Sequence, residues 1–461
     1  MIKRYPMELK LLGDAHRPFI HYCAPFAGLS GTVALVSGGS MDCSRYSLLG
    51  IYPYASLRSR GSNLTLECEG RRSTHRGNPF EYLESIFGES DSDTLPEYLP
   101  FAGGAMGYLG YELGGFLEKL PVPKDSTLAL PDLCLFFPSI VLIRDRVEQQ
   151  DYLLQSLAAP AEAVRTIRRM AAGNGLPAEF PGRPVAAMKV TSNFTREGYL
   201  AAVEQVRRHI HAGDIYQANL SQRFRCNYPG EAFPLFARLL AANPASFFAF
   251  LNEGGSSVLS SSPERFLFRR GEIVESRPIK GTRPRSLDPA QDKLNRQALL
   301  SSPKDDAELS MIVDLVRNDL GRVCVPGSVR VQHHKLMESY RNVHHLVSVV
   351  TGRLTPAENN INLIRALFPA GSITGCPKIR AMEIINDLEP YPRGVYTGAI
   401  GYLGWHQNLD LNVAIRTAVL KNDTLRFSVG GGIVYDSDPE AEYLETLHKG
   451  ETFFKLLGVK I

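Results

Sequence analysis

Lys280 lies in an apolar segment led by Pro278 and is followed directly by Gly281 and Thr282. A buried ammonium group is costly unless it is paired, and burial lowers its pKa toward neutrality. A lysine with a lowered pKa can act as a nucleophile or a base. The more ordinary alternative is a lysine at a strand end whose amino group extends into solvent. Residues elsewhere in the sequence distinguish the buried, reactive lysine from the solvent-exposed one.

Two pairs of carboxylates have a spacing of three residues: Asp305 with Glu308, and Glu442 with Glu445. In a helix this spacing places both carboxylates on one face. Two such faces brought together would form an all-oxygen site, which suits Mg²⁺ with some waters retained. Either pair alone is more simply a solvated acidic face. The first pair, however, precedes the apolar run 311–315, so its helix is expected to enter a core.

Several segments could bind anions. Residues 368–378 form a Gly/Ser/Thr loop that leads into a helix amino terminus, where N–H groups and the helix dipole favour negative charge. A glycine triplet at 430–432 ends a strand and can offer backbone N–H groups to a carboxylate. Arg416 and Lys449 add cations. This inventory predicts a small dianionic substrate with at least one carboxylate bound to Mg²⁺.

The elements that position these groups follow from hydrophobic periodicity and end signals. Helices are predicted from the N-cap Thr195 to about 210, at 304–317, 360–368 and 377–388 with Pro377 in the first turn, and from Pro439 to Leu457. Strands are predicted at 32–37, 215–223, 247–251, 258–261, 266–275, 395–403, 411–420 and 425–429, with a hairpin over 53–67. Strands in blocks with helices between them predict an α+β fold with mixed sheets.

An internal repeat adds to this prediction. Residues 104–111 (GAMGYLGY) match 398–405 (GAIGYLGW), and the hairpin at 53–67 resembles one that begins at Pro263. Two matches in the same order predict two related halves. Residues 157–190, rich in Ala, Pro and Gly around a short basic helix, are interpreted as a linker between an amino-terminal region (1–156) and a carboxyl-terminal region (191–461).

Composition excludes several classes of protein. The 461 residues carry a net charge of +3, with 44% hydrophobic and 21% charged residues, which is typical of a soluble globular protein. Without basic tracts, neither nucleic acid nor an anionic membrane is expected as a partner. No signal sequence or membrane span is recognised. Seven scattered cysteines indicate a reducing cytoplasm, with neither disulfides nor structural zinc.

Five motifs taken together, at 262–265, 278–282, 314–319, 371–378 and 430–445, closely resemble the chorismate-utilising enzymes. This family includes component I of anthranilate synthase, its aminodeoxychorismate counterpart, and the isochorismate and salicylate synthases. The resemblance implies a large composite mixed-sheet and helix fold of the anthranilate synthase component I type. It is dense from about residue 190 onward. The amino-terminal region resembles the family's tryptophan-binding region, which implies a tryptophan site near Ser37 and Tyr46.

The resemblance also implies roles for single residues. Glu308 and Glu445 would bind Mg²⁺ directly, with Asp305 and Glu442 acting through water. Glu264 would be the general acid that protonates the departing C4 hydroxyl, for which it needs a raised pKa. His345 occupies the position of the active-site histidine. The substrate-binding residues would be Thr282, Ser372, Thr374, Tyr396, Arg416, Gly430, Gly431, Gly432 and Lys449, with Tyr396 and Arg416 on the enolpyruvyl carboxylate.

Two positions distinguish the branches of this family. The branch that uses water carries a lysine where this chain has Gln217, and the anthranilate branch usually has alanine where this chain has Lys280. Lys280 therefore implies amination of chorismate at C4, to 4-amino-4-deoxychorismate and on toward 4-aminobenzoate and folate. Because no glutaminase signature is found, ammonia is expected from solution or from a separate glutamine amidotransferase subunit. Anthranilate synthase component I, or a non-catalytic tryptophan-binding partner subunit, are the alternatives.

Overall fold

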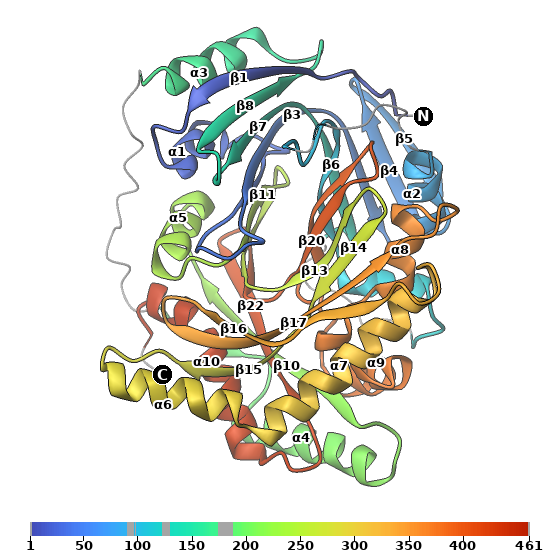
Figure 1. Ribbon diagram of the computed structural model, residues 1–461, viewed down its shortest axis with the longest axis vertical. Coiled ribbons are helices and arrows are strands. Elements are labelled where there is room, and N and C mark those ends of the chain that lie inside the picture. The colour runs from blue at the N-terminus through green and yellow to red at the C-terminus, as the bar shows by residue number, and fades with distance from the viewer. Residues whose placement is uncertain (1, 90–95, 97, 122–129, 174–187, 460–461) are drawn as a thin grey trace.

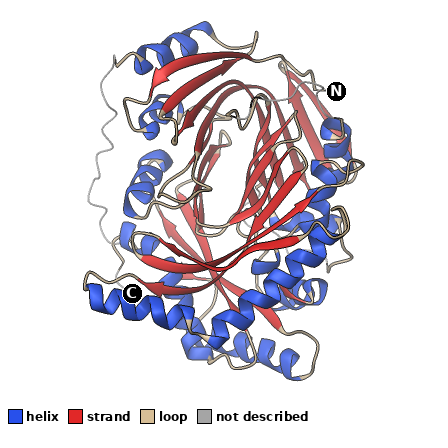
Figure 2. Ribbon diagram, in the orientation of Figure 1, coloured by secondary structure: helices blue, strands red, loops and turns tan. Residues whose placement is uncertain are grey.

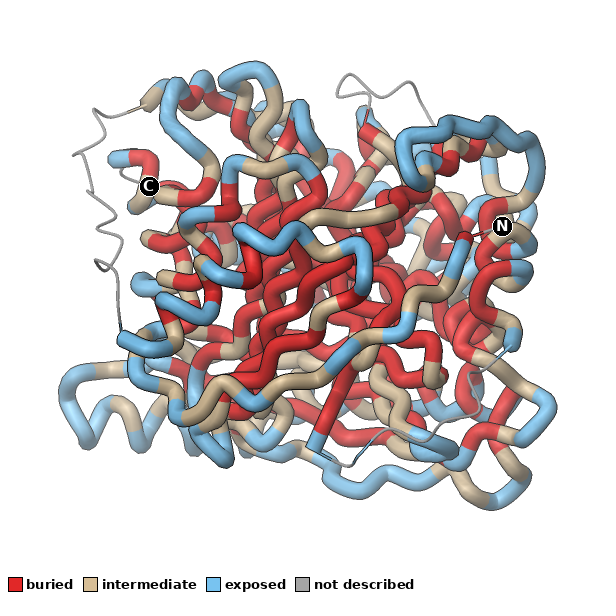
Figure 3. Tube along the Cα trace, turned by 90° about the horizontal axis from the view of Figure 1, so that it is seen from above, coloured by how far each residue is buried: buried red, intermediate tan, exposed pale blue. Residues whose placement is uncertain are grey.

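The structure is a computed structural model that describes residues 2–89, 96, 98–121, 130–173 and 188–459 (Figure 1). In this part of the chain, 22 strands join through hydrogen bonds into one continuous sheet system. The strands run through the interior, and most helices lie on the outside (Figure 2). The buried residues follow the strands, as the tube in Figure 3 shows. An α+β fold is thereby confirmed.

The first eight strands precede the predicted linker: β1 (Glu8–Asp14), β2 (Val33–Val36), β3 (Tyr46–Arg60), β4 (Asn63–Cys68), β5 (Arg71–Arg76), β6 (Gly104–Leu109), β7 (Leu133–Asp145) and β8 (Gln150–Gln155). The others are β9 (Thr191–Ser192), β10 (Gln217–Asn227), β11 (Phe247–Asn252), β12 (Ser256–Ser262), β13 (Arg265–Arg270), β14 (Ile273–Arg277), β15 (Ile279–Pro284), β16 (Arg330–Ser339), β17 (Val343–Arg353), β18 (Gly375–Cys376), β19 (Ala399–Gly404), β20 (Leu409–Val413), β21 (Thr417–Lys421) and β22 (Thr424–Ile433).

The α-helices of the described residues are α1 (Phe19–Cys23), α2 (Pro79–Phe87), α3 (Ala161–Ala171), α4 (Arg196–His211), α5 (Ala232–Ala242), α6 (Pro289–Leu300), α7 (Pro303–Gly321), α8 (Asn360–Leu367), α9 (Lys378–Leu388) and α10 (Pro439–Leu456). Short 3₁₀ helices occur at η1 (Ala24–Phe26), η2 (Tyr111–Phe116) and η3 (Gly371–Ile373).

The internal repeat forms the centre of the sheet. Strands β6 and β19, which carry the two copies of the motif, pair antiparallel with Gly107 opposite Gly401. These two glycines hold the same position in the motif, so the pair has local two-fold symmetry. The neighbours follow it: β7, β3 and β4 lie beyond β6, and β20, β13 and β14 lie beyond β19. The hairpins β3–β4 and β13–β14 are the second repeated pair, which confirms two related halves.

A glycine is required at the centre of each copy. A Cβ on Gly107 would lie 2.0 Å from the carbonyl oxygen of Cys134, and one on Gly401 would lie 1.9 Å from that of Asp410. Both values are far below any normal contact, so a side chain at either position would force the neighbouring strand away. The glycine is therefore repeated because each copy packs equally close against a neighbouring strand.

Most predicted elements match the structure, but several differ. The strand predicted at 266–275 is two strands, β13 and β14, and the glycine triplet predicted to end a strand lies inside β22. The single strand predicted at 411–420 is two strands, β20 and β21, broken around Arg416, whose φ of 49° cannot continue a strand. Pro377 is the N-cap of α9 rather than a residue of its first turn. The strand predicted from 395 begins only at Ala399, because Thr397 has a φ of 63°.

The two regions proposed on either side of the linker share the sheet. Strand β2 of the first region pairs with β11 of the second, and β6 pairs with β19. The basic helix predicted within the linker is α3, and its buried residues, including Ile167, pack into a core cluster with residues of both regions. Linker residues 174–187 lie outside the described part. The proposed division at 156 and 191 stays a prediction.

Helices α7 and α10 and the strands beside them carry the chemistry-bearing residues toward one another. Helix α7 lies against β15 and β17, and α10 lies against β22 and α4. Strand β22 pairs in turn with β10. In Figure 1 these elements gather in the half of the molecule that also holds α9.

Two further expectations concern the state of the cysteines and the presence of membrane-spanning helices. All seven cysteines are free thiols, so the expectation that they form no disulfides is confirmed. None of the helices in the described ranges is long and apolar enough to cross a membrane.

Candidate active site

Lys280 lies on β15 with its amino group turned inward. Its Nζ donates a hydrogen bond to the carbonyl oxygen of Ser372 at 3.3 Å. Burial lowers the pKa of Lys280, while the negative charges of Glu308 and Glu264 act in the opposite direction. The lysine therefore does not extend freely into solvent as the ordinary alternative would have it. A larger fraction of neutral amine makes it a better nucleophile.

Glu264 lies between β12 and β13, with only 4% of its surface exposed. The hydroxyl of Ser372 donates to its Oε1 at 2.5 Å. Burial raises the pKa of Glu264 to about 7, although the Ser372 hydrogen bond and the Lys280 charge both lower it. A carboxyl group with this pKa is partly protonated at neutral pH and can donate a proton. The raised pKa that the sequence required of a general acid is present.

His345 joins β17 to β15 and to Arg416. Its Nδ1 lies 2.9 Å from the Thr282 hydroxyl, its cross-strand neighbour, and its Nε2 lies 3.3 Å from an Arg416 nitrogen. Burial and the Arg416 charge lower the pKa of His345 to about 3, so the ring is neutral. Since arginine can only donate, Nε2 must accept, and the proton resides on Nδ1.

Arg416 sits in the break between β20 and β21, where its φ is 49°. Burial lowers its pKa, and no carboxylate of the described residues forms an ion pair with it. A buried guanidinium without an anionic partner is costly. A carboxylate of the substrate would complete it with two parallel hydrogen bonds.

Three carboxylates from α7 and α10 share one region. Burial raises the pKa of Glu308, and the charges of Glu442 and Glu445 raise it further. The positive charge of Lys449 lowers the pKa of Glu445 to about 2, with Lys449 Nζ 2.6 Å from its Oε1. Glu442 is 3% exposed and accepts from the Ser437 hydroxyl at 2.6 Å. Its other oxygen, Oε2, is buried and has no donor among the described residues.

The glycine triplet leaves room beside these groups. A Cβ on Gly431 would lie 3.2 Å from Glu442 Oε2 and 3.7 Å from Glu445 Oε1. One on Gly432 would lie 3.2 Å from Lys280 Nζ, and one on Gly430 would lie 3.1 Å from the Tyr396 hydroxyl. The backbone of β22 at these three glycines therefore lies close to the lysine, the carboxylates and the tyrosine, and a side chain at any of them would crowd its neighbours.

Mg²⁺ needs several oxygen ligands around one point. Among the residues that the structure describes, no three carboxylate, imidazole or thiolate side chains converge into a finished metal cluster. Lys304, 3.5 Å from Glu442, and Lys449 supply the positive charge that the carboxylates require. The orphaned Glu442 Oε2 and the open face of Gly431 are nevertheless compatible with a cation bound between α7 and α10.

Two of the predicted site residues are less well placed. Asp305 forms an ion pair with Arg283 at 2.9 Å rather than joining the other carboxylates. The Thr374 hydroxyl donates to the carbonyl oxygens of Ala370 and Gly371, and so stabilises its own loop. Ser372 of the same loop does face the site.

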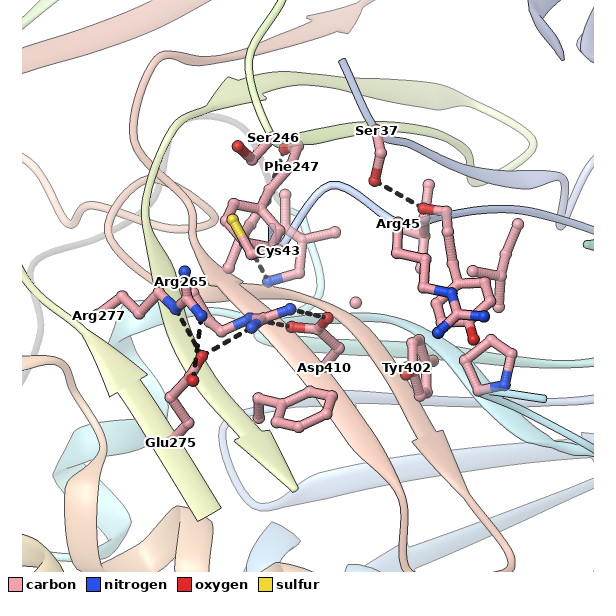
Figure 4. A pocket seen from close by; sticks show the side chains of 18 of the residues that line it. Ser37, Cys43, Arg45, Ser246, Phe247, Arg265, Glu275, Arg277, Tyr402 and Asp410 are labelled. Atoms are coloured by element: carbon pink, nitrogen blue, oxygen red, sulfur yellow. Dashed lines mark hydrogen bonds and ion pairs between the residues drawn. The ribbon is translucent and has the colours of Figure 1, made fainter. Parts of the chain in front are cut away.

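Ser37 and Tyr46 lie in a separate cavity of about 260 Å³ (Figure 4). The Ser37 hydroxyl donates to the Tyr46 carbonyl oxygen at 2.6 Å, and Arg45 lies over the Tyr46 ring. Across the cavity, Arg265 bridges Glu275 and Asp410. Figure 4 shows this charged group on the opposite wall from Ser37.

A buried pair behind the site was missed in the sequence. Arg393 binds both oxygens of Glu389, and also donates to the carbonyl oxygens of Ile373 and Asn219. Glu389 in turn accepts from the backbone N–H and hydroxyl of Ser221. In a sequence, a glutamate and an arginine four residues apart are normally interpreted as an exposed ion pair. The prolines at 390 and 392 between the two residues were the only available signal that it is not.

Fold and site together define an enzyme for a small carboxylate substrate: a buried acid, an inward lysine and a guanidinium surround the glycine-rich end of β22 beside clustered carboxylates. The chain belongs to the chorismate binding enzyme family, whose family model matches residues 43–455.

Named relatives lie on two branches of this family. The chain is 41% identical to aminodeoxychorismate synthase component 1 of Klebsiella aerogenes, over 93% of this chain and 94% of that protein. It is 40% identical to anthranilate synthase component 1 of Cereibacter sphaeroides, over 90% of this chain and 86% of that protein. Among solved structures, anthranilate synthase component I from Streptococcus pneumoniae TIGR4 matches with a TM-score of 0.79 at 32% identity, covering 90% of this chain and 93% of that one.

Proposed function

We propose that the protein aminates chorismate at C4 to give 4-amino-4-deoxychorismate, a precursor of 4-aminobenzoate and folate. Identity alone does not choose between the branches, since relatives of both kinds match at 40–41%. The observation that carries the proposal is the position of Lys280, whose Nζ binds the carbonyl oxygen of the same Ser372 whose hydroxyl binds Glu264. Nucleophile and acid are thus held by one residue.

In the first step Glu264 protonates the C4 hydroxyl, which leaves as water with the electron pair of the C4–O bond. The neutral amine of Lys280 adds to C2 as the ring double bonds shift. The carboxylate left on Glu264 is stabilised by the Ser372 hydroxyl and the nearby lysine charge. Departure of water and attack by nitrogen thus occur with a proton donor and a nucleophile already in place.

In the second step ammonia forms a bond to C4, and the C2–Nζ bond breaks with its electron pair returning to Lys280. The new C4 ammonium group gives one proton to Glu264, which restores the acid. The overall change is chorismate plus ammonia to aminodeoxychorismate plus water. Without Lys280, ammonia would itself have to add at C2, which leads toward anthranilate.

The other residues bind and orient the substrate. Arg416, with His345 fixing its direction, and Tyr396 are suited to the enolpyruvyl carboxylate, and Lys449 with the 430–432 glycines to the ring carboxylate. Glu308, Glu442 and Glu445 would hold Mg²⁺, with Asp305 contributing at most through water. When bound, Mg²⁺ would neutralise the ring carboxylate and fix its orientation.

Ammonia is proposed to come from a separate glutamine amidotransferase subunit in the cytoplasm. The relatives named as component 1 of two-component synthases support this view. A second proposal is that tryptophan binds in the cavity of Ser37 and Tyr46, whose walls carry both acidic and basic side chains.

Product identification tests the main proposal. The full chain is incubated with chorismate, Mg²⁺ and ammonium chloride, with and without a separate pyruvate-releasing lyase. Aminodeoxychorismate is expected in both reactions and 4-aminobenzoate only with the lyase. Fluorescent anthranilate formed without lyase would instead establish C2 amination, and absence of any chorismate turnover would favour a non-catalytic subunit.

A further inference from the structure

Lys378 is the first residue of α9, directly after the loop 368–377. The helix dipole disfavours a cation at this end of a helix, so its position calls for a specific partner. The side chain turns back along the loop: its Nζ donates to the carbonyl oxygen of Leu367 at 2.8 Å and to Oδ2 of Asp319 at 2.7 Å. Lys378 therefore joins the two ends of the loop to each other and to α7.

The ion pair of Lys378 and Asp319 is mostly buried, with side chains that are 13% and 11% exposed. Burial lowers the pKa of Lys378 and raises that of Asp319, while the charge of each residue acts on the other in the opposite direction. A buried ion pair is weak evidence for a stabilising role, since apolar residues of similar volume often do as well. Asp319 also lines one small cavity with Glu264 and Ser372. The pair therefore lies directly behind the proposed acid.

The loop that this pair secures packs on α7 and carries Ser372. A Cβ on Gly371 would lie 2.6 Å from a side-chain carbon of Leu315, so loop and helix are in direct contact. The hydroxyl of Ser372 donates to Glu264, and its carbonyl oxygen accepts from Lys280. Movement of the loop away from α7 would therefore lengthen both of these hydrogen bonds.

We infer that the ion pair of Lys378 and Asp319 is a positioning clasp for the loop 368–377. It holds the loop against α7, and so keeps Ser372 in contact with Glu264. Neither member of the pair touches the substrate in the proposed reaction, and both act through the serine. The inference rests on the proposed function only in taking Glu264 as the acid.

The charged groups around Glu264 determine what a loosened clasp would do. The hydrogen bond from Ser372 lowers the pKa of Glu264, as do the charges of Lys280 on β15 and Lys449 on α10. Arg265, which also lines the small cavity, is bound to two carboxylates. Loosening the clasp weakens the hydrogen bond and leaves the three cations in place, so the pKa of Glu264 should rise.

The sign of the change distinguishes positioning from a direct effect of charge. Lys378→Met leaves the negative charge of Asp319 near Glu264, which by itself would raise the pKa of that carboxyl. Asp319→Asn leaves the positive charge of Lys378, which by itself would lower it. Loss of the clasp, in contrast, raises the pKa of Glu264 in both variants. Asp319→Asn is therefore the decisive substitution.

The test follows the ionisation of Glu264 directly. Infrared difference spectra between each full-length protein and its Glu264→Gln counterpart give the protonated carboxyl band across pH without substrate. The alkaline limb of product formation is measured in the same variants. Lys335→Met is the matched control, because Lys335 also forms an ion pair with an aspartate of α7, Asp306, at 2.6 Å.

Asp319→Asn and Lys378→Met are each expected to raise the pKa of Glu264 by about half a unit or more. Ser372→Ala removes the hydrogen bond itself and should raise it by about one unit. Lys335→Met should leave it unchanged. Once Ser372 is alanine, Asp319→Asn should no longer raise the pKa, because the bond through which it acts is gone. A fall or no change in Asp319→Asn alone would overturn the inference.

Two further outcomes are distinguishable. If Lys378→Met fails to fold because Asp319 is left unpaired, both substitutions are combined, which leaves neither charge buried. The double variant should show the same rise, and an unchanged pKa of Glu264 in it would also overturn the inference. If wild-type protein makes no aminodeoxychorismate, the proposed function fails, but the infrared titration still tests the clasp: a rise in Asp319→Asn supports it, and no rise contradicts it.

Discussion

The hydroxyl of Ser372 donates a hydrogen bond to Oε1 of Glu264 at 2.5 Å, and the carboxyl group it binds is buried. The hydrogen bond favours the ionised form, and burial favours the protonated form. Their balance leaves the pKa of Glu264 at about 7. Glu264 can therefore lose a proton in one step and regain it in the next at neutral pH.

A bell-shaped pH dependence is expected from this balance. Protonated Glu264 is lost as pH rises above about 7, so the rate at saturating free ammonia should fall on the alkaline side. Neutral Lys280 is lost as pH falls, which sets the acid side, and burial moves that limb to lower pH. Initial rates of aminodeoxychorismate formation across pH test this. Glu264→Gln should lose roughly 10²–10⁴-fold in rate and the alkaline limb; an alkaline limb that persists in the variant assigns it to another group.

Stability should change with pH in the opposite sense to an ordinary carboxylate. The pKa of Glu264 is raised from near 4.5 to about 7, so the folded protein binds more protons than the unfolded chain between these values, and stability falls as pH rises through them. Glu264→Gln removes this cost, and should stabilise the fold by about 3 kcal/mol at pH 8 and by about 1 kcal/mol at pH 5. Urea unfolding at both pH values measures the difference. An equal effect at the two pH values would refute the titration of Glu264.

Lys280→Ala should abolish amination at C4, because no nucleophile remains to occupy C2. Ammonia can then add only at C2, and the expected residual activity is slow formation of the 2-amino product. Product analysis with ammonium chloride detects either outcome. Wild-type yields of aminodeoxychorismate in this variant would rule out a covalent role for Lys280.

Mg²⁺ binding should depend on Glu445 and not on Glu440, another carboxylate of α10. Glu445→Gln is expected to weaken Mg²⁺ binding by ten-fold or more, about 1.4 kcal/mol, because it removes one charge from the region shared with Glu308 and Glu442. Calorimetry with Mg²⁺ measures this without reference to turnover. Glu440→Gln is the control, since Glu440 pairs with Arg196 at the exposed start of the helix. Equal Mg²⁺ affinities in both variants would place the metal elsewhere.

Arg393→Met should destabilise the fold strongly, by about 3–5 kcal/mol, because Glu389 is left buried without its cation. Arg380→Met is the matched control: Arg380 pairs with Glu383 near the surface, where such pairs contribute only about 0–1 kcal/mol. Chemical denaturation compares the two. Combining Arg393→Met with Glu389→Gln should recover part of the loss, and absence of any recovery would contradict the pairing as its cause.

The sequence was sufficient for features that repeat locally. Periodicity located α4, α7 and α10, and the two glycine motifs indicated the symmetry that pairs Gly107 with Gly401. The carboxylate spacing predicted which helix faces carry acid. These signals depend on neighbours within a few residues, which is the range over which sequence patterns are informative.

Long-range contacts and backbone breaks could not be predicted in this way. The positive φ of Arg416 splits a predicted strand, although nothing in its neighbours marks a turn. Arg283 pairs with Asp305, and Lys304 with Glu442, across segments that only the fold brings together. Likewise, only the fold brings the side chain of Gln217 beside Gly432 of β22.

The pairing of β10 with β22, against which α10 packs, determines when the protein can first act during its own synthesis. Gln217 leaves the ribosome long before Glu445, since 227 residues lie between them. Until α10 has emerged, Glu308 faces no second acidic helix and Lys280 lacks the charge of Lys449 nearby. A nascent chain therefore lacks the acidic face of α10 and the charge of Lys449, so the proposed site is assembled only when the last helix has folded.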